Sequence, residues 1–126
     1  MLYYISFGVR DLNRSGAFYD AALGALGLRR VFEDATAGGY EMVNRDDDLC
    51  LKLRSDTFAP GPGFHLAFAA ASRAAVDAFD GAAPRVAGID NGVPGLRRKY
   101  GSHDYAAFLK DPDGYRIEVV TKAPPG

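Results

Sequence analysis

The sequence predicts an α+β protein that is built from two copies of one strand–helix–strand–strand–strand unit. Short segments alternate between apolar and polar residues as strands do, and two other segments have apolar residues at helical spacing. The second half also repeats the first: residues 65–68 (HLAF) lie over residues 4–7 (YISF), an offset of 61, and the same offset places Phe79 over Phe18. A repeated unit that cannot bury its own apolar face explains why two copies pack together.

The first copy begins with a strand over residues 2–9, in which Tyr3, Ile5, Phe7 and Val9 fall on one side. Asp11 is placed to cap a helix, and Gly27 follows the end of that helix. Three further strands are expected over residues 28–33, 37–43 and 49–54.

The second copy repeats this order. A strand over residues 64–70 precedes a helix that Ser72 caps and Pro84 ends. The remaining strands are expected over residues 85–89 (weak), 105–110 and 115–121. Asp111-Pro112-Asp113-Gly114 is a strong turn signal between the last two, because proline favours the first corner and glycine tolerates positive φ.

Length and composition fit one domain. The 126 residues are 48% hydrophobic and 25% charged, which suits a globular core. We expect the domain to cover residues 1–122, with one module over about 1–56, the second over about 63–122, and a frayed tail at 123–126.

The net charge and the cysteine content limit which partners and which cellular compartment are expected. A net charge of −1 gives no general attraction to nucleic acid or to anionic lipid, so neither is expected as a partner. The lone Cys50 favours a reducing compartment, and the N-terminus has no signal-peptide pattern, so a cytoplasmic location is expected.

Several motifs in order resemble the glyoxalase/bleomycin resistance protein/extradiol dioxygenase (vicinal oxygen chelate) superfamily. The segments that carry the resemblance are residues 8–12 (GVRDL), 17–19 (AFY), 26–28 (LGL), 65–68 (HLAF) and 108–118 (FLKDPDGYRIE). The resemblance implies two βαβββ modules whose strands form an open, curved, eight-stranded mixed sheet around a cleft. It also implies a homodimer and a small-molecule substrate or ligand.

The resemblance further implies a set of metal-ligand positions. Relatives that bind a divalent metal such as Zn, Fe, Mn or Ni hold it on the first, fourth, fifth and eighth strands. His65 and Glu118 match the fifth-strand and eighth-strand positions. Tyr4 stands where the first-strand histidine is expected, and the fourth-strand position falls near Lys52, where a carboxylate is expected.

The alternation of side chains along the strands groups the same residues independently of the family resemblance. On each strand concerned one face is apolar, and Tyr4, Lys52, His65 and Glu118 all fall on the opposite face. Three interpretations follow. Glu118 and His65 hold a metal, completed by His103 or Tyr4; they form a hydrogen-bonded pair, with Lys52 neutralising Glu118; or Glu118 is a base, with Tyr4 or Lys52 stabilising negative charge.

A basic loop follows residue 95. Arg97, Tyr100 and His103 either close over the cleft and bind substrate or belong to a solvated loop.

Three functions are therefore expected as candidates. The first is a metal-assisted lyase, isomerase or dioxygenase with an altered metal site, in which Glu118 and Tyr4 are catalytic and Lys52, Arg97, Tyr100 and His103 bind substrate. The second is a non-catalytic small-molecule binder of the bleomycin-resistance type. The third is a metal-independent isomerase or lyase that uses Glu118.

Overall fold

The computed structural model describes residues 5–41, 49–57, 60–61, 63–82, 89–90, 95–96 and 104–122. The side chains of Phe32, Glu41, Ile89, Asp90 and Leu96 are not described. The expected frayed tail and the expected strand residues 2–4, 42–43 and 85–88 lie outside these ranges.

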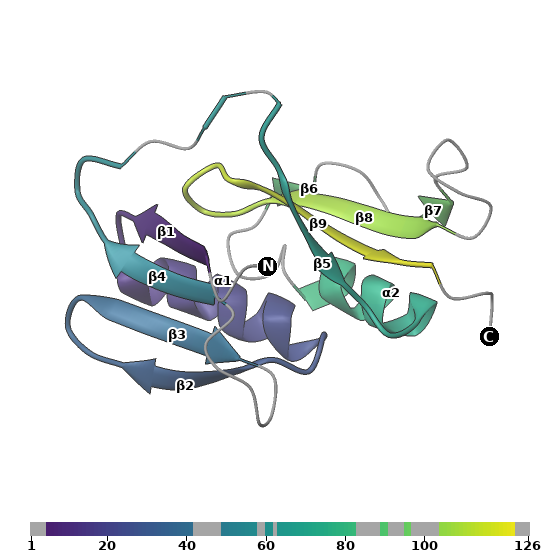
Figure 1. Ribbon diagram of the computed structural model, residues 1–126, viewed down its shortest axis with the longest axis horizontal. Coiled ribbons are helices and arrows are strands. Elements are labelled where there is room, and N and C mark those ends of the chain that lie inside the picture. Colours follow the sequence, from purple (N-terminus) through teal and green to yellow (C-terminus); the bar gives the residue numbers. More distant parts are fainter. Residues whose placement is uncertain are drawn as a thin grey trace.

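The first module contains one helix and a four-stranded sheet (Figure 1). Its elements are β1 (Ile5–Val9), α1 (Leu12–Gly24), β2 (Arg29–Glu33), β3 (Ala37–Glu41) and β4 (Leu49–Leu53). The strand order is β1-β4-β3-β2, with β1 and β4 parallel and the other pairs antiparallel. The Asp11 side chain caps α1 by accepting a hydrogen bond from Arg14 N at 3.1 Å, and Gly27 follows the helix with φ of 90°.

The second module repeats this order. Its elements are β5 (Leu66–Ala69), α2 (Arg73–Ala82), β6 (Ile89–Asp90), β7 (Gly95–Leu96), β8 (Tyr105–Lys110) and β9 (Arg116–Thr121). β5 pairs with β9 in parallel, and β8 pairs with β9, β6 and β7 in antiparallel orientation. Within the described residues, β6 overlaps the predicted weak strand (85–89) only at residue 89, and β7 lies in the segment after it for which no strand is predicted.

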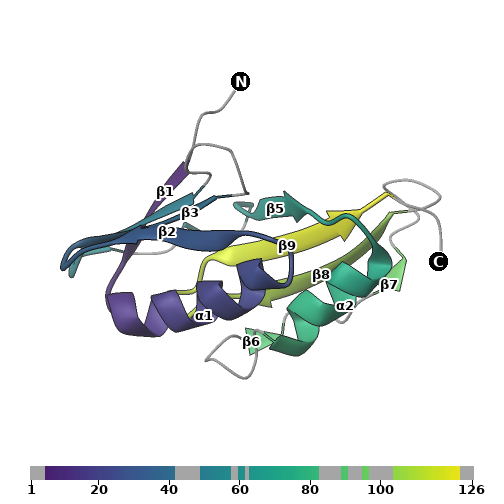
Figure 2. The same cartoon turned by 90° about the horizontal axis from the view of Figure 1, so that it is seen from below.

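The structure confirms the α+β class with paired modules. The eight-stranded sheet is seen only in part, because each module forms a sheet of its own and the second includes the short β6 and β7. Figure 2 shows both helices on one side of the two sheets, so that the uncovered faces of both sheets point the same way. Phe18 and Phe79, the pair that revealed the repeat, are both fully buried beneath their sheets.

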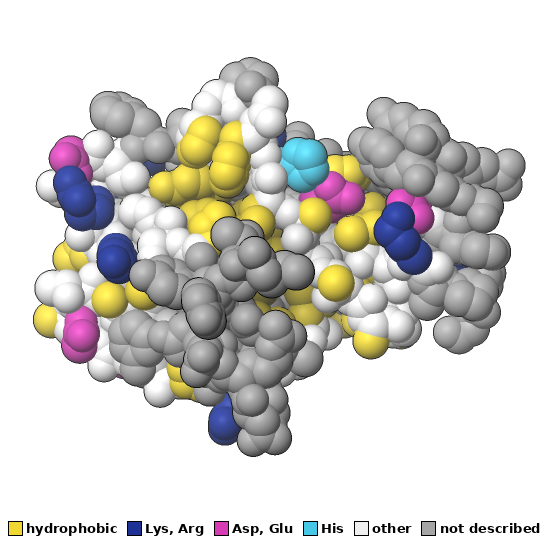
Figure 3. Space-filling model, in the orientation of Figure 1, with side chains coloured by type: hydrophobic (Ala, Val, Ile, Leu, Met, Phe, Trp, Pro, Cys, Tyr) yellow, Lys and Arg dark blue, Asp and Glu magenta, His cyan; other side chains and the backbone are white. Residues whose placement is uncertain are grey.

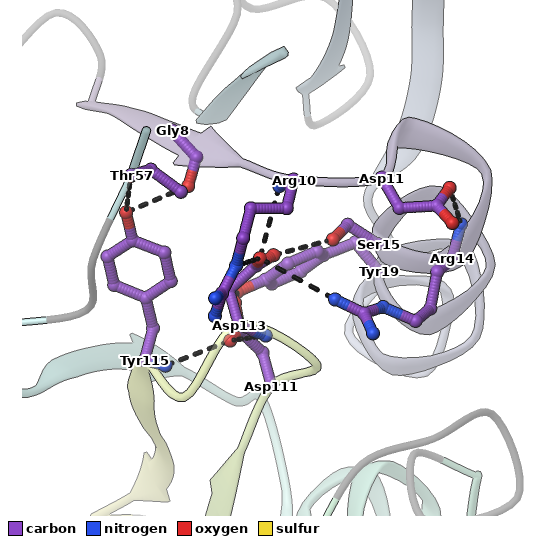
Figure 4. A network of polar contacts seen from close by, with 10 residues as sticks. All are labelled: Gly8, Arg10, Asp11, Arg14, Ser15, Tyr19, Thr57, Asp111, Asp113 and Tyr115. Carbon is purple, nitrogen blue, oxygen red and sulfur yellow. Dashed lines mark hydrogen bonds and ion pairs between the residues drawn. The ribbon is translucent and has the colours of Figure 1, made fainter. Parts of the chain in front are cut away.

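Asp113, in the turn between β8 and β9, docks the second module on the start of α1 (Figure 4). Its side chain is fully buried, and it accepts hydrogen bonds from Arg10 N at 3.1 Å, Arg10 Nε at 3.3 Å and Ser15 Oγ at 2.9 Å. Arg14 Nη2 lies 3.7 Å from the same carboxylate. These contacts join residues that are about a hundred positions apart in the sequence, and they fix one module against the other.

Asp111 supports the same turn from inside. Its Oδ1 accepts hydrogen bonds from the backbone N–H groups of Asp113 and Tyr115, both at 2.9 Å, and its Oδ2 accepts one from Tyr19 Oη at 2.5 Å. Burial raises the pKa of Asp111 to about 6, although these hydrogen bonds favour its ionised form. The buried carboxyl therefore titrates in a pH range in which an exposed aspartate is already fully ionised.

We expect Asp111→Asn to change how stability depends on pH. The folded chain holds the Asp111 proton more tightly than the unfolded chain, in which the pKa is near ~3.9. Its stabilising contribution is complete below about pH 4 and is lost as the pH rises through about 6. The stability difference between the variant and the wild type should shift by roughly 2 kcal/mol in favour of the variant between pH 4 and 7.

Urea unfolding of both proteins at several pH values measures this shift. Subtracting one pH profile from the other removes the contribution of groups that both proteins share and leaves chiefly that of Asp111. Parallel pH profiles would contradict the expectation.

Tyr115 completes the contact between the modules. Its ring stacks on Phe7 with centroids 4.4 Å apart, and its hydroxyl donates to the carbonyl oxygen of Gly8 at 2.8 Å. Thr57 Oγ1 lies 3.3 Å from the same hydroxyl. The second module thus supports the strand β1 and the segment that follows β4.

Candidate functional site

The uncovered faces of the two sheets form the surface on which the sequence places its candidate residues. Figure 3 shows this face, on which hydrophobic side chains gather between basic side chains near β4 and the histidine near β5. Ser6 and Lys52 on the first sheet, and Ala67 and Ala69 on the second, are exposed there. Small and polar residues on this face leave room for a ligand.

The second sheet brings Glu118 and His65 together. His65 Nε2 lies 3.0 Å from Glu118 Oε1. Glu118 is buried at 7% exposure, whereas 53% of the His65 side chain is exposed. In the strand register Glu118 lies opposite Ala67 on β5 and Phe108 on β8. The result is a buried carboxylate that is held by one imidazole, beside an alanine whose methyl group leaves space.

The first sheet differs at the corresponding positions. Glu118 pairs with Ala67, and the repeat offset places Ala67 over Ser6 (67 − 61 = 6), which pairs with Cys50. The strand register thus assigns the position equivalent to Glu118 to Cys50, two residues before Lys52. Cys50 is buried at 8% exposure, and Lys52 is exposed on the same face.

Four of the predicted site residues cannot be placed. Tyr4, Arg97, Tyr100 and His103 lie outside the described residues. Their predicted roles in catalysis and substrate binding therefore stay predictions.

Lys52 can be placed on β4 of the first sheet, where it is exposed. Among the described residues the ion-pair partner of Glu118 is His65. Lys52 instead lines a pocket of about 430 Å³ on the first sheet. No ion pair between Lys52 and Glu118 is found among the described residues, and the interpretation in which Lys52 neutralises Glu118 stays a prediction.

Comparison with known proteins decides the family. Residues 2–119 match the family model of the Glyoxalase/Bleomycin resistance protein/Dioxygenase superfamily. The chain belongs to this superfamily. Among curated proteins, none matches the sequence.

Solved structures of the superfamily agree with the fold. A glyoxalase/bleomycin resistance protein from Albidiferax ferrireducens T118 is 31% identical, with a TM-score of 0.83 over 96% of this chain and 98% of that one. The fosfomycin resistance protein FosX from Mesorhizobium loti is 17% identical, with a TM-score of 0.71 over 96% and 91%. A mutant of glyoxalase I from Zea mays is 21% identical, with a TM-score of 0.73 over 96% of this chain and 46% of that one.

Members of the superfamily often bind a divalent metal, so the fit of this chain's residues to a metal matters. Within the part of the chain that the structure describes, no group of three or more His, Cys, Asp or Glu side chains is placed to hold a metal ion. Zinc sites normally use at least three protein ligands. His65 and Glu118 supply two ligands, and His65 Nε2 already contacts Glu118 Oε1. The described residues therefore do not fit a metal centre.

The structure also reports on membrane insertion. No helix in the described ranges is both long enough and apolar enough to cross a bilayer.

Sequence reasoning missed two features of the site. The first is the pocket around Lys52, which Ser6, Gly8, Arg54 and Thr57 also line. Strand alternation places Arg54 on the face of Lys52, and that signal was available. The second is the Asp111–Asp113 network, whose partners Tyr19 and Ser15 no local pattern identifies.

Proposed function

We propose that this protein is a small-molecule enzyme of the superfamily, an isomerase or lyase in which Glu118 transfers a proton without a metal. The observation that carries the proposal is the His65–Glu118 pair on the uncovered face, with 3.0 Å between Nε2 and Oε1. A positioned carboxylate within reach of a ligand is a competent general base. His65 is a positioning residue in this account, because it holds one carboxylate oxygen and leaves the other for the ligand.

Glu118 and His65 differ in their exposure to solvent, and this difference gives them different roles. Glu118 is shielded from bulk water, which strengthens its interaction with a bound ligand. Half of the His65 side chain reaches solvent, and its Nε2 atom contacts Glu118 Oε1, so the imidazole holds the carboxylate from the solvent side. A proton taken from one ligand atom and returned to another gives an isomerase, and one taken with loss of a neighbouring group gives a lyase.

The test is a search for enzyme-dependent proton exchange. Small carbonyl and carboxylate compounds are incubated with the protein in D2O, and loss of carbon-bound proton signals is followed by NMR. We expect exchange with at least one compound, and we expect the rate to persist in excess EDTA. Exchange that stops in EDTA and returns with added Zn, Fe, Mn or Ni would contradict the metal-independent account.

A second candidate is a non-catalytic small-molecule binding protein. Cys50 and Lys52 favour it, because this chain lacks a carboxylate at the position equivalent to Glu118 in the first module. The similar protein from Mesorhizobium loti is named a fosfomycin resistance protein, which also favours a role in binding a harmful small molecule. Bleomycin itself is a poor ligand for this candidate, because a net charge of −1 provides no strong field for a cationic drug. Saturable binding without conversion of any ligand would favour it.

The expected homodimer also belongs to the proposal. Its measurement is the mass of the protein in solution by light scattering. A mass close to twice 13.5 kDa is expected, and a mass of one chain at all concentrations would contradict it.

A further inference from the structure

The pocket on the first sheet is separate from the His65–Glu118 pair. It measures about 430 Å³ and is lined by Ser6, Phe7, Gly8, Lys52, Arg54, Asp56 and Thr57. Neither His65 nor Glu118 lines it, although both sites belong to faces that the helices leave uncovered. Both sites are therefore open to a ligand from the same side of the sheets.

The charges of the pocket favour an anion. Two basic side chains, Lys52 and Arg54, face one acidic side chain, Asp56, in a chain whose net charge is −1. Arg54 donates hydrogen bonds from Nε and Nη2 to Oδ1 and Oδ2 of Asp56, both at 3.3 Å, but 64% and 71% of these side chains are exposed. An exposed pair of this kind is held weakly, so Arg54 can turn to a ligand at little cost.

Thr57 packs closely against Gly8 at one wall of the pocket. Gly8 pairs with Lys52 in the β1–β4 register. A Cβ at Gly8 would lie 2.5 Å from Thr57 Oγ1. The Gly8 carbonyl is held by Tyr115, whose hydroxyl also contacts Thr57. The second module thereby keeps this wall of the pocket in place before any ligand arrives.

We propose that this pocket is an anion subsite, in which Lys52 and Arg54 bind the carboxylate or another small oxyanion group of the ligand. The subsite gives the enzyme proposed above a ligand class, namely compounds with a carboxylate or another small oxyanion group. It rests on that proposed function in one respect, which is that the uncovered face binds the ligand. Arginine and lysine form charge-assisted hydrogen bonds with such groups, and the apolar surface beside the pocket suits the ligand's carbon skeleton.

The test uses benzoate, inorganic phosphate and the neutral analogue benzamide as probes in titration calorimetry. Wild type should bind benzoate or phosphate saturably and benzamide at least about tenfold more weakly. Lys52→Gln/Arg54→Gln should weaken anion binding by about tenfold or more, whereas Asp56→Asn should strengthen it. The matched control Arg29→Gln/Lys122→Gln removes the same charge from exposed positions outside the pocket and should leave binding unchanged. Preference between benzoate and phosphate identifies the anionic group.

Three results would overturn the subsite: no saturable anion binding by wild type, equal binding of benzoate and benzamide, or equal losses in the pocket and control variants. These results are independent of turnover. If Glu118→Gln abolishes proton exchange while the pocket variant binds anions as wild type does, the subsite fails and the proposed enzyme stands. If the pocket variant loses anion binding but no proton exchange is found, the subsite stands without the enzyme.

Discussion

Asp113→Ala should destabilise the folded chain by about 2–4 kcal/mol. The substitution removes the acceptor for the buried Ser15 hydroxyl and for the Arg10 backbone N–H. It also removes the carboxylate that Arg10 and Arg14 approach from the first module. A buried donor that loses its acceptor retains its desolvation cost, which is why this loss exceeds that of a surface contact. Urea unfolding at pH 7 measures the change.

Asp77→Ala is the matched control for this prediction. Asp77 accepts a hydrogen bond from Tyr105 Oη at 2.7 Å, but the contact is exposed. Its loss should change stability by less than about 1 kcal/mol. Equal effects of the two substitutions would mean that the turn does not fix one module against the other.

Glu118→Gln should lower the rate of proton transfer by at least about a hundredfold. The amide nearly preserves the volume of the side chain and can still contact His65, but it cannot accept a proton at this site. Ligand affinity should change far less than the rate, because the anion subsite lies elsewhere on the uncovered face. The measurement is the exchange rate in D2O together with a binding titration of the same compound.

Two further variants separate catalysis from structure. Glu33→Gln alters an exposed glutamate on β2 and should leave the rate unchanged. His65→Gln should lower the rate less than Glu118→Gln and should alter the pH profile of the rate, as expected of a positioning residue. A Glu118→Gln protein with the wild-type rate would remove Glu118 from the mechanism.

The two repeated modules and the faces of their strands were predictable from the sequence. Alternation placed His65 and Glu118 on one face, and the pair at 3.0 Å confirms that they meet. The offset of Phe18 and Phe79 identified the two modules because both rings are buried at the same depth of their helices. These signals depend on residues that are close in sequence or that repeat at one fixed distance.

The rest depends on contacts between distant segments. The sequence around residues 111–114 predicts a turn, but Asp111 bonds Tyr19, 92 positions away, and nothing local marks that partner. The register of β1 with β4 likewise fixes Cys50 rather than Lys52 as the equivalent of Glu118, and strand alternation alone cannot choose between residues two positions apart.

The metal content of the untagged protein tests the central claim most directly. Wild type and His65→Ala are incubated with Zn, Fe, Mn or Ni, freed of excess metal by gel filtration, and measured by elemental analysis. The account predicts far less than one metal ion per chain in both proteins, because His65 and Glu118 alone do not complete a site. A content near one per chain in wild type that is lost in His65→Ala would contradict it, and would show that residues outside the described ranges complete a metal centre.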